Sequence, residues 1–322
     1  MRMARIKLAG ESAVYHCISR IVGGQRLLDD LGKEKLVGIL RKLAECCNVE
    51  VITYCIMSNH FHLLLRVPIR VELSDTELLA KIVKFYGKKG ILTSLAQEGL
   101  KVRGKSDPDI RDSVVSRMGD VSAFMKELKQ RFSRWYDKTM GRFGTLWAER
   151  FSSVVVEDSA TALRTVAAYI DLNPIRAGLV KDPKDYRFCG YAAALTGATT
   201  IRQSLMSFLE PADWGKAAAE YRRLLFVTAG SANHSDKAVL DRQTIRAELA
   251  RGGELSLGQV LRLRVRQMSD GVVLGSKDFV NEMFVRHRDR FSARRKDGAR
   301  PIRGVPLPGL CVMRDLRVNA IG

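Results

Sequence analysis

The first part of the chain combines short β-rich runs with one clear helical pattern. Residues 13–22, AVYHCISRIV, are rich in β-forming side chains and lead into a Gly-Gly turn, which predicts a strand. Residues 32–47 place apolar side chains at helical spacing. Two more β-rich runs follow, VEVITYCIMS and HFHLLLRV, with a tight junction at Asn59 between them. The order strand, helix, strand, strand predicts an α+β fold with helices on one face of a sheet.

The middle of the chain contains an irregular stretch and then a strong helical pattern. Residues 69–118 are predicted to be an insertion, with a helix near 76–90 and an exposed, charged segment at 101–113. Residues 120–141 carry an apolar and aromatic stripe that predicts a core-facing helix. Its basic flank is either a solvated face or a phosphate-binding one, and it supplies the candidate DNA contacts Lys129, Arg131 and Arg134.

A second marked helix follows a predicted turn and strand at 142–158. The helix is expected to begin at an N-cap residue, Asp158 or Ser159, and to bury Leu163 and its helical neighbours. Pro174 is expected to end or kink the helix just after Asn173, because proline lacks the amide hydrogen that a helix needs.

The pattern changes after about residue 200. Four short helical stretches separated by Gly and Ser predict a helical accessory region over 201–322, beside a first domain over 1–200. Two of these helices, joined by SDGVVLG, could form a helix-turn-helix. The dense basic run at 286–303 is either a DNA-backbone-binding arm or a solvated tail, and its candidate contacts are Arg294, Arg295 and Lys296.

Composition indicates what kind of partner the protein binds and in which compartment it is expected. The 322 residues include 54 Lys and Arg against 35 Asp and Glu, a formal net charge of +19, which favours a polyanionic partner such as nucleic acid. The sequence has no signal-peptide pattern and no apolar run long enough to cross a membrane. The six cysteines show no C-x-x-C pairing and are expected to be reduced thiols in a cytoplasmic protein.

Two histidines stand out in the predicted strand HFHLLLRV. His60 and His62 are two residues apart, so in a strand their side chains share one face. One histidine on a strand is usually structural, but two on the same face suit a metal ion. On the second helix, Tyr169 and Asn173 are four residues apart and share a face, where core packing is the ordinary role of the tyrosine. An Asn oxygen also suits Mg²⁺ or Mn²⁺.

Five motifs occur in an order that resembles a known family. They are YHCISR, YCIMSNHFHLLLRVP, FMKELKQRFSRWY, GTLWAERF and AAYIDLNPIRAGLV. Together they resemble the REP-associated tyrosine transposases, relatives of the single-tyrosine HUH transposases of insertion sequences. The similarity covers roughly residues 12–195, and the 69–118 segment interrupts it.

The resemblance implies a fold, a site and a reaction. The implied fold is a ferredoxin-like antiparallel sheet (the HUH nuclease fold) whose histidine strand faces the tyrosine helix. The implied metal ligands are His60, His62 and Asn173, holding Mg²⁺ or Mn²⁺, and the implied nucleophile is Tyr169. The family cuts and rejoins single-stranded DNA, often beside hairpins, through a 5′-phosphotyrosine. Arg164 and Arg176 are further candidate phosphate contacts.

Two other functions stay open at this point. One is a hairpin-binding protein derived from a transposase that no longer cuts, and the other is a related HUH nickase for plasmid replication or mobilisation. The sequence leaves open the DNA sequence recognised, the choice of metal, a monomer or a homodimer, and transposition in the cell. Tyr15, Tyr54 and Tyr136 are alternative tyrosines near the core.

Overall fold

A sheet lies at the centre of the computed structural model, which describes residues 5–8, 10–69, 73–87, 115, 118–226, 267–302, 307 and 309–316. Four strands form its main part in the order β2-β3-β1-β4, and every pair among them is antiparallel. Their bounds are β1 Ala13–Arg20, β2 Glu50–Ile56, β3 His60–Val67 and β4 Ser152–Val156. The predicted α+β class with an antiparallel sheet is confirmed.

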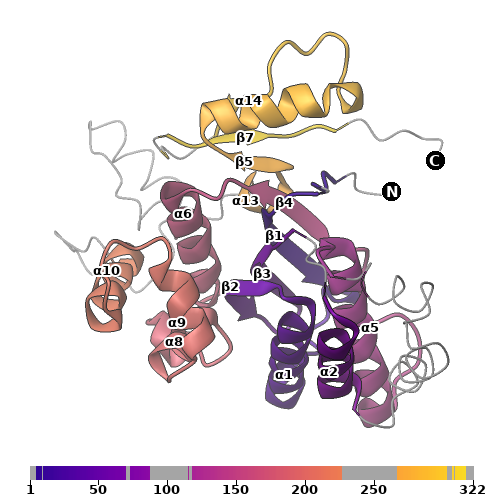
Figure 1. Cartoon of the computed structure of the whole chain (residues 1–322). Helices are drawn as coiled ribbons and strands as arrows, with labels where there is room; N and C mark the ends of the chain where they lie inside the picture. Colours follow the sequence, from indigo (N-terminus) through magenta and orange to yellow (C-terminus); the bar gives the residue numbers. More distant parts are fainter. Residues whose placement is uncertain are drawn as a thin grey trace.

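Helices cover both faces of this sheet, which corrects the expectation that they lie on one face (Figure 1). On β3, Phe61 contacts Trp147, which packs against Phe132 of helix α5, Val121–Met140. The neighbouring His62 points the opposite way, toward Tyr169 of helix α6. The reason lies in β3 itself, because Leu63, Leu64 and Leu65 are all fully buried and both faces of the strand therefore need cover.

The helices begin and end where local sequence signals place them. Helix α1, Asp30–Cys47, has Asp29 as N-cap and ends at Asn48 in the left-handed conformation, with a φ of 55°. Helix α6, Ala160–Asp171, begins after Ser159, whose hydroxyl accepts from the Ala162 amide. The short helix α7, Asn173–Arg176, follows with proline in its first turn. The predicted helix end is therefore present but lies at Asp171, before Asn173 and not just after it, because proline is well accommodated at the start of the new helix.

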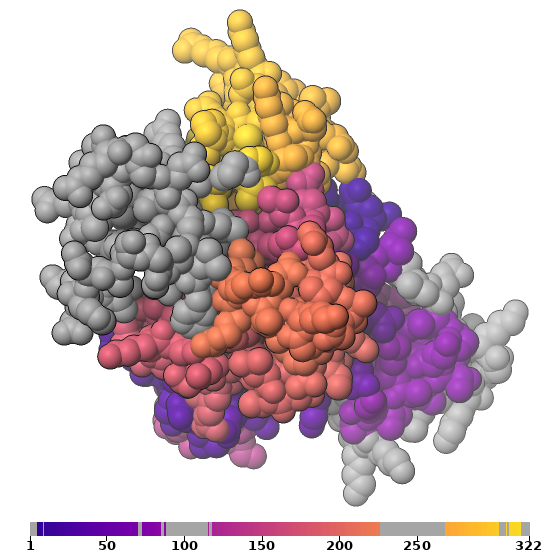
Figure 2. Space-filling model, turned by 90° about the vertical axis from the view of Figure 1, so that its left-hand side faces the viewer, coloured from indigo at the N-terminus to yellow at the C-terminus, as the bar shows by residue number. Residues whose placement is uncertain are grey.

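The chain after residue 200 contributes strands to the same sheet. Strand β5, Val273–Gly275, pairs in parallel with β4, and β7, Cys311–Met313, joins β5 to β6, Arg300–Pro301. Figure 2 shows this yellow layer above the orange and pink helices. A purely helical C-terminal region was therefore a wrong expectation, because strands this short have no detectable alternation. The expected turn of the helix-turn-helix, at 269–275, contains β5 instead.

The other described elements complete the two helical layers. Helices α8, α9 and α10 lie on the same side as α6, whereas α2 packs beside α1 (Figure 1). Their bounds are α2 Asp75–Tyr86, α8 Gly190–Leu195, α9 Thr199–Met206, α10 Trp214–Phe226, α13 Gln267–Asp270 and α14 Lys277–Arg286, with single 3-10 turns at Val22–Gly24, Pro183–Asp185 and Arg288–Arg290. Among the described helices, none is long and apolar enough to cross a membrane.

Several sequence expectations fall partly or wholly outside the described residues. The predicted helix at 241–253 and most of the one at 255–268 lie there, as does the charged segment 101–113 of the insertion. The domain boundary expected near residue 200 stays a prediction, and strands from both sides of it share one sheet.

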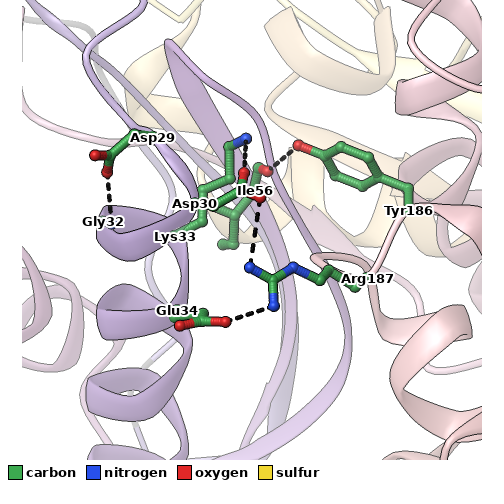
Figure 3. Close-up of polar contacts among 8 residues, drawn as sticks. All are labelled: Asp29, Asp30, Gly32, Lys33, Glu34, Ile56, Tyr186 and Arg187. Carbon is green, nitrogen blue, oxygen red and sulfur yellow. Dashed lines mark hydrogen bonds and ion pairs between the residues drawn. The ribbon is translucent and has the colours of Figure 1, made fainter.

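The turn before β3 is fixed by contacts from distant parts of the chain. The Tyr186 hydroxyl donates to the carbonyl of Ile56 at 2.7 Å, and Arg187 pairs with Glu34 at the start of α1 (Figure 3). The main-chain oxygens of Ser58 and Asn59 also accept from the amides of Leu28 and Ile21. These contacts fix the point at which the histidine strand begins.

Candidate active site

The four residues predicted to act in chemistry line one cavity. His60 and His62 come from β3, Tyr169 from α6 and Asn173 from the start of α7, around a space of about 440 Å³. The Tyr169 and His62 rings meet edge to face with centroids 6.3 Å apart, and the His60 and His62 centroids are 5.1 Å apart. The structure thus brings together residues that are more than a hundred positions apart in sequence.

A third histidine, His16 on β1, sets the hydrogen-bonding state of His62. The His16 side chain is fully buried, with Nδ1 2.8 Å from the carbonyl of Met268 and Nε2 2.9 Å from His62 Nδ1. A carbonyl only accepts, so His16 carries its proton on Nδ1 and offers the Nε2 lone pair. His62 must then donate from Nδ1, which leaves its own Nε2 lone pair for a cation.

Burial keeps this pair neutral. Burial lowers the pKa of His16 to about 4, and burial followed by the neighbouring His16 and His60 holds the pKa of His62 well below its ordinary value. A neutral imidazole is the form that binds metals. At neutral pH His62 is therefore in the form that a metal ligand needs, and the neutral His16 ring can accept its hydrogen bond.

His60 is oriented by its neighbour in the chain. Its Nδ1 lies 2.6 Å from Oδ1 of Asn59, an acceptor, so the proton of the neutral ring is on Nδ1 and the lone pair on Nε2. The Asn59 side chain in turn donates to the carbonyl of Gly24 at 3.3 Å. His60 and His62 therefore present the same type of ring nitrogen to a ligand.

Asn173 supplies the third donor of the predicted metal set. Its amide nitrogen donates to the carbonyls of Ile170 at 3.1 Å and Tyr169 at 3.4 Å. Because both hydrogen bonds use the nitrogen, the amide oxygen is the atom that can ligate a cation. Within the described part of the chain, no group of three His, Cys, Asp or Glu side chains could hold a metal ion. An ion in this cavity would therefore take two imidazoles and an amide oxygen.

Tyr169 is held by contacts on its ring, its hydroxyl and its main chain. The Arg176 guanidinium carbon lies 4.0 Å from the ring centroid, and Nη2 of the same arginine donates to the Tyr169 carbonyl at 2.6 Å. The Tyr169 hydroxyl is 3.0 Å from the Ser269 hydroxyl, on α13. A guanidinium next to the tyrosine also gives the cavity a cation for a phosphate group.

The other tyrosines considered from the sequence lie elsewhere. The Tyr15 hydroxyl accepts from the Leu8 amide, Tyr136 donates to the Leu27 carbonyl, and Tyr54 is next to Arg41. None of these three lines the cavity, whereas Tyr169 does.

The last residue of the tyrosine helix, Asp171, is buried and fixes the end of that helix. Its carboxylate accepts from the hydroxyls of Thr53 and Tyr221 at 3.0 and 2.8 Å and from the Tyr191 amide at 3.1 Å. Burial raises the pKa of Asp171 to about 7, against these donors. The contacts tie α6 to β2, α8 and α10, and so fix the helix that carries Tyr169.

The eight predicted DNA-contact residues have different surroundings. Arg176 lines the cavity, whereas Arg164 donates to the carbonyl of Phe208 and pairs with Glu220 at 3.1 Å. Arg131 pairs with Glu127 on its own helix. Lys129 and Arg134 line a separate, larger cavity, and in the basic run Arg294 and Lys296 are exposed while Arg295 binds main-chain carbonyls.

Three residues of the site were missed by sequence reasoning. His16 belongs to the quoted motif YHCISR, and a polar ring in an apolar strand was the signal that could have found it. Arg20, at the end of the same strand, also lines the cavity. Ser269 had no signal, because it lies 100 positions from Tyr169 in the sequence.

Comparison with known proteins gives one family match, and it covers the histidine strand. Residues 10–84 match the family model described as transposase IS200 like. This confirms the resemblance to transposases over that segment. The transposase-like segment contains β1, α1, β2, β3 and most of α2, and hence His16, His60 and His62, but not Tyr169.

Other comparisons add less. A solved structure described as a REP-associated tyrosine transposase bound to a REP hairpin shares 15% identity with this chain, over 61% of this chain and 86% of that one, with a TM-score of 0.39. The search of curated proteins gives no match.

Proposed function

We propose that this protein is a divalent-metal-dependent endonuclease and strand transferase for single-stranded DNA, in which Tyr169 is the nucleophile. The observation that carries the proposal is the cavity that Tyr169, His60, His62 and Asn173 share. The hydrogen bonds of the two histidines place their protons on Nδ1, so each has its Nε2 lone pair for a cation. The transposase match over residues 10–84 supports the same class of reaction. We also propose that the protein acts on single-stranded DNA beside a DNA hairpin, as the sequence resemblance implies.

In the proposed reaction, the Tyr169 oxygen attacks the scissile phosphorus. A tyrosyl O–P bond forms and the bond from phosphorus to the 3′ oxygen breaks. The proton lost from the Tyr169 hydroxyl balances the one that the 3′ oxygen gains, so that the strand leaves with a 3′ hydroxyl. Rejoining reverses these steps, so no external energy source is consumed. Ser269 is placed to exchange a hydrogen bond with the tyrosine oxygen, and Arg176 to offset phosphate charge.

His60, His62 and Asn173 would hold the cation, and the choice between Mg²⁺ and Mn²⁺ is part of the proposal. When bound, the cation polarises the phosphate and offsets the charge that develops on it. A tyrosine hydroxyl is a weak nucleophile at neutral pH, so this help is needed.

A cleavage assay tests the nucleophile. End-labelled single-stranded hairpin DNA from the flanks of the protein's own gene is incubated with protein and Mn²⁺ or Mg²⁺ and run on a denaturing gel. We expect a metal-dependent DNA–protein adduct that disappears in Tyr169→Phe and persists in Tyr136→Phe, a matched control outside the cavity. Tight binding without an adduct, across both metals, would favour the alternative of a hairpin-binding protein that does not cut.

A second variant tests the metal ligands through His16, which we propose acts as a positioning residue. His16→Phe keeps a ring in the buried site but removes the acceptor for His62 Nδ1, and outer contacts of this kind are worth about 10–100-fold in metal affinity. Calorimetric titration of Mn²⁺ into the DNA-free protein measures the loss. We expect partial rescue in His16→Gln, which keeps an acceptor, and unchanged affinity in both variants would refute the role.

A further inference from the structure

A second, larger cavity lies along helix α5, outside the candidate active site. Its volume is about 840 Å³, and it is formed between α5 and the segment 145–151. Two carboxylate residues, Asp137 and Glu149, are part of the lining, against a larger set of cations. We call this cavity the α5 groove, and its cations are Arg5, Lys126, Lys129, Arg134 and Arg150.

Some of these cations are crowded together. Lys129 donates to the main-chain carbonyl of Glu149 at 2.6 Å and lies 5.4 Å from the centroid of the Trp147 ring. Burial, followed by the charges of Arg5 and Arg150, lowers the pKa of Lys129 to about 8. Burial and Arg150 also lower the pKa of Arg5. These groups repel one another, and a bound anion would relieve the repulsion.

The α5 groove adjoins the cavity of the candidate active site. Ala148 lines both cavities. Its amide donates to the carbonyl of Arg20 at 2.9 Å, and Trp147 forms a β-bridge with Ile21. Arg20 and Ile21 both line the cavity that contains Tyr169. The segment 145–151 therefore lies between the two cavities, with Arg20 and Arg176 in the lining of one and Lys129 in the lining of the other.

We propose that the α5 groove binds the sugar-phosphate backbone of single-stranded DNA that runs on from the phosphate at Tyr169. The inference rests on the proposed function, since it takes the scissile phosphate to lie in the cavity of Tyr169. The cations of α5, from Lys126 to Arg134, spread over about two helical turns, and such a spread suits a row of phosphates better than a single anion. The contacts are to the backbone, so they position the strand without reading its sequence.

The test compares two double variants with the same loss of charge. Lys126→Gln/Arg134→Gln removes two exposed cations of the α5 groove. Lys216→Gln/Arg223→Gln removes two exposed cations of α10, which lies across the sheet from α5 (Figure 1). All four side chains are exposed, so both variants should fold. Circular dichroism and thermal melting check this.

Fluorescence anisotropy then measures binding of a labelled hairpin with a flank of about ten unpaired thymidines, longer than many single-strand sites. The measurements use EDTA and the Tyr169→Phe background, so that binding is read without cleavage. For the groove variant we expect affinity about tenfold weaker at 0.1 M salt, and a salt slope smaller by about 1.4, since each single-strand phosphate contact contributes about 0.7. The blunt hairpin without a flank and the α10 variant should show little change.

The outcomes separate the two proposals. If the groove variant binds the flanked hairpin with the affinity and salt slope of its parent, or loses affinity equally for blunt and flanked hairpins, the α5 groove is not a binding site for the flank. That result would leave the cleavage reaction untouched. If the groove variant loses binding to the flank, and the protein with Tyr169 intact never forms an adduct in the cleavage assay, the α5 groove is supported and the proposed reaction is rejected.

Discussion

The cations of the α5 groove line a cavity, and within the described part of the chain only Arg5 and Lys129 among them donate to main-chain carbonyls, whereas several arginines of residues 286–302 bind the protein itself. In the second region Arg288 donates to the carbonyls of Ser292 and Ala293, and Arg290 donates to the carbonyl of Arg5. Arg286 pairs with Glu11. The denser of the two basic sequences is thus the one whose arginines are used to hold the fold.

The difference teaches how a basic run should be interpreted. Arg295 lies 4.8 Å from the centroid of the Phe291 ring, and that ring packs against Phe284 of α14. An arginine has five N–H donors and can therefore satisfy several carbonyls in a loop that has no ladder partners. In the α5 groove the helix already satisfies its own carbonyls, so the exposed Lys126 and Arg134 are not needed for them, although Lys129 donates to the Glu149 carbonyl of the facing segment.

The largest expected effect is on stability, from Arg295→Met. The substitution keeps an apolar stem but removes donors to the carbonyls of Asp297, Gly298 and Arg314. We expect a loss of about 2–4 kcal/mol in the free energy of unfolding, because several polar groups lose partners at once. Urea denaturation measures it. The matched neighbour Lys296→Met, an exposed side chain, should stay within about 0.5 kcal/mol.

The opposite outcome would reverse the comparison. If Arg295→Met were as stable as the parent and bound single-stranded DNA more weakly, the 286–302 region would be the binding arm that its sequence first indicated.

Most of the sheet and its first helices could be predicted from sequence. The periodicity of β1, α1, β2, β3, α5 and α6 is long enough to be detected, and the N-cap Ser159 and Pro174 are local signals. The candidate site came from His60 and His62, which share a face by strand geometry alone. Its link to Tyr169 and Asn173 came from the family resemblance, and the structure places all four residues at one cavity.

The C-terminal strands, the role of His16 and the partners of the basic residues depend on contacts between distant parts of the chain, which no local sequence pattern contains. Strands β5 and β7 have three residues each and exist because they pair with the edge of β4 and with each other. His16 acquires its role only when β1 pairs with β3 and α13 brings the Met268 carbonyl to it. The surroundings of the basic residues could not be predicted for the same reason, since a charge in sequence does not say whether its partner is a carbonyl or a phosphate.

A second effect on stability is expected at Arg164, which was predicted to bind DNA. Its Nε donates to the carbonyl of Phe208, and Nη2 lies 3.1 Å from Glu220 of α10. For Arg164→Met we expect a loss of about 1–2 kcal/mol, because both partners are partly shielded from solvent. A double-mutant cycle with Glu220→Gln isolates the ion pair. DNA affinity should not change beyond the loss caused by unfolding, and a fall in affinity at full stability would return Arg164 to the DNA contacts.

A smaller effect is expected from the pH dependence of DNA binding at Lys129. Its pKa of about 8 means that the amine is charged below pH 8 and loses its proton as the pH rises through that value. Affinity for the flanked hairpin should therefore be constant from pH 6 to 7 and fall about fivefold by pH 9, since one charge beside a phosphate is worth about 1 kcal/mol in water. Anisotropy titrations at constant ionic strength measure it.

The control for this titration is Lys129→Gln, which should bind more weakly at pH 7 and show a flat profile up to pH 9. The groups that face Lys129 are Arg5, Arg150, the Glu149 carbonyl and the Trp147 ring. Arginines stay charged over this range, so a slope that persists in Lys129→Gln would assign the titration to another part of the protein.

The smallest effect is expected from Arg294→Gln/Lys296→Gln, and it gives the sharpest contrast between the two regions. Both side chains are exposed, and they lie in the most basic stretch of the chain. If charge alone determined binding, removing them would cost as much affinity as removing Lys126 and Arg134, since each double variant lowers the net charge by the same amount. We expect instead a change of less than about twofold for the flanked hairpin at 0.1 M salt, because an exposed cation beyond the reach of the bound strand is screened within about 10 Å. Equal losses in the two variants would mean that the protein attracts DNA through its overall charge, and that the position of the α5 groove beside Tyr169 has no consequence for binding.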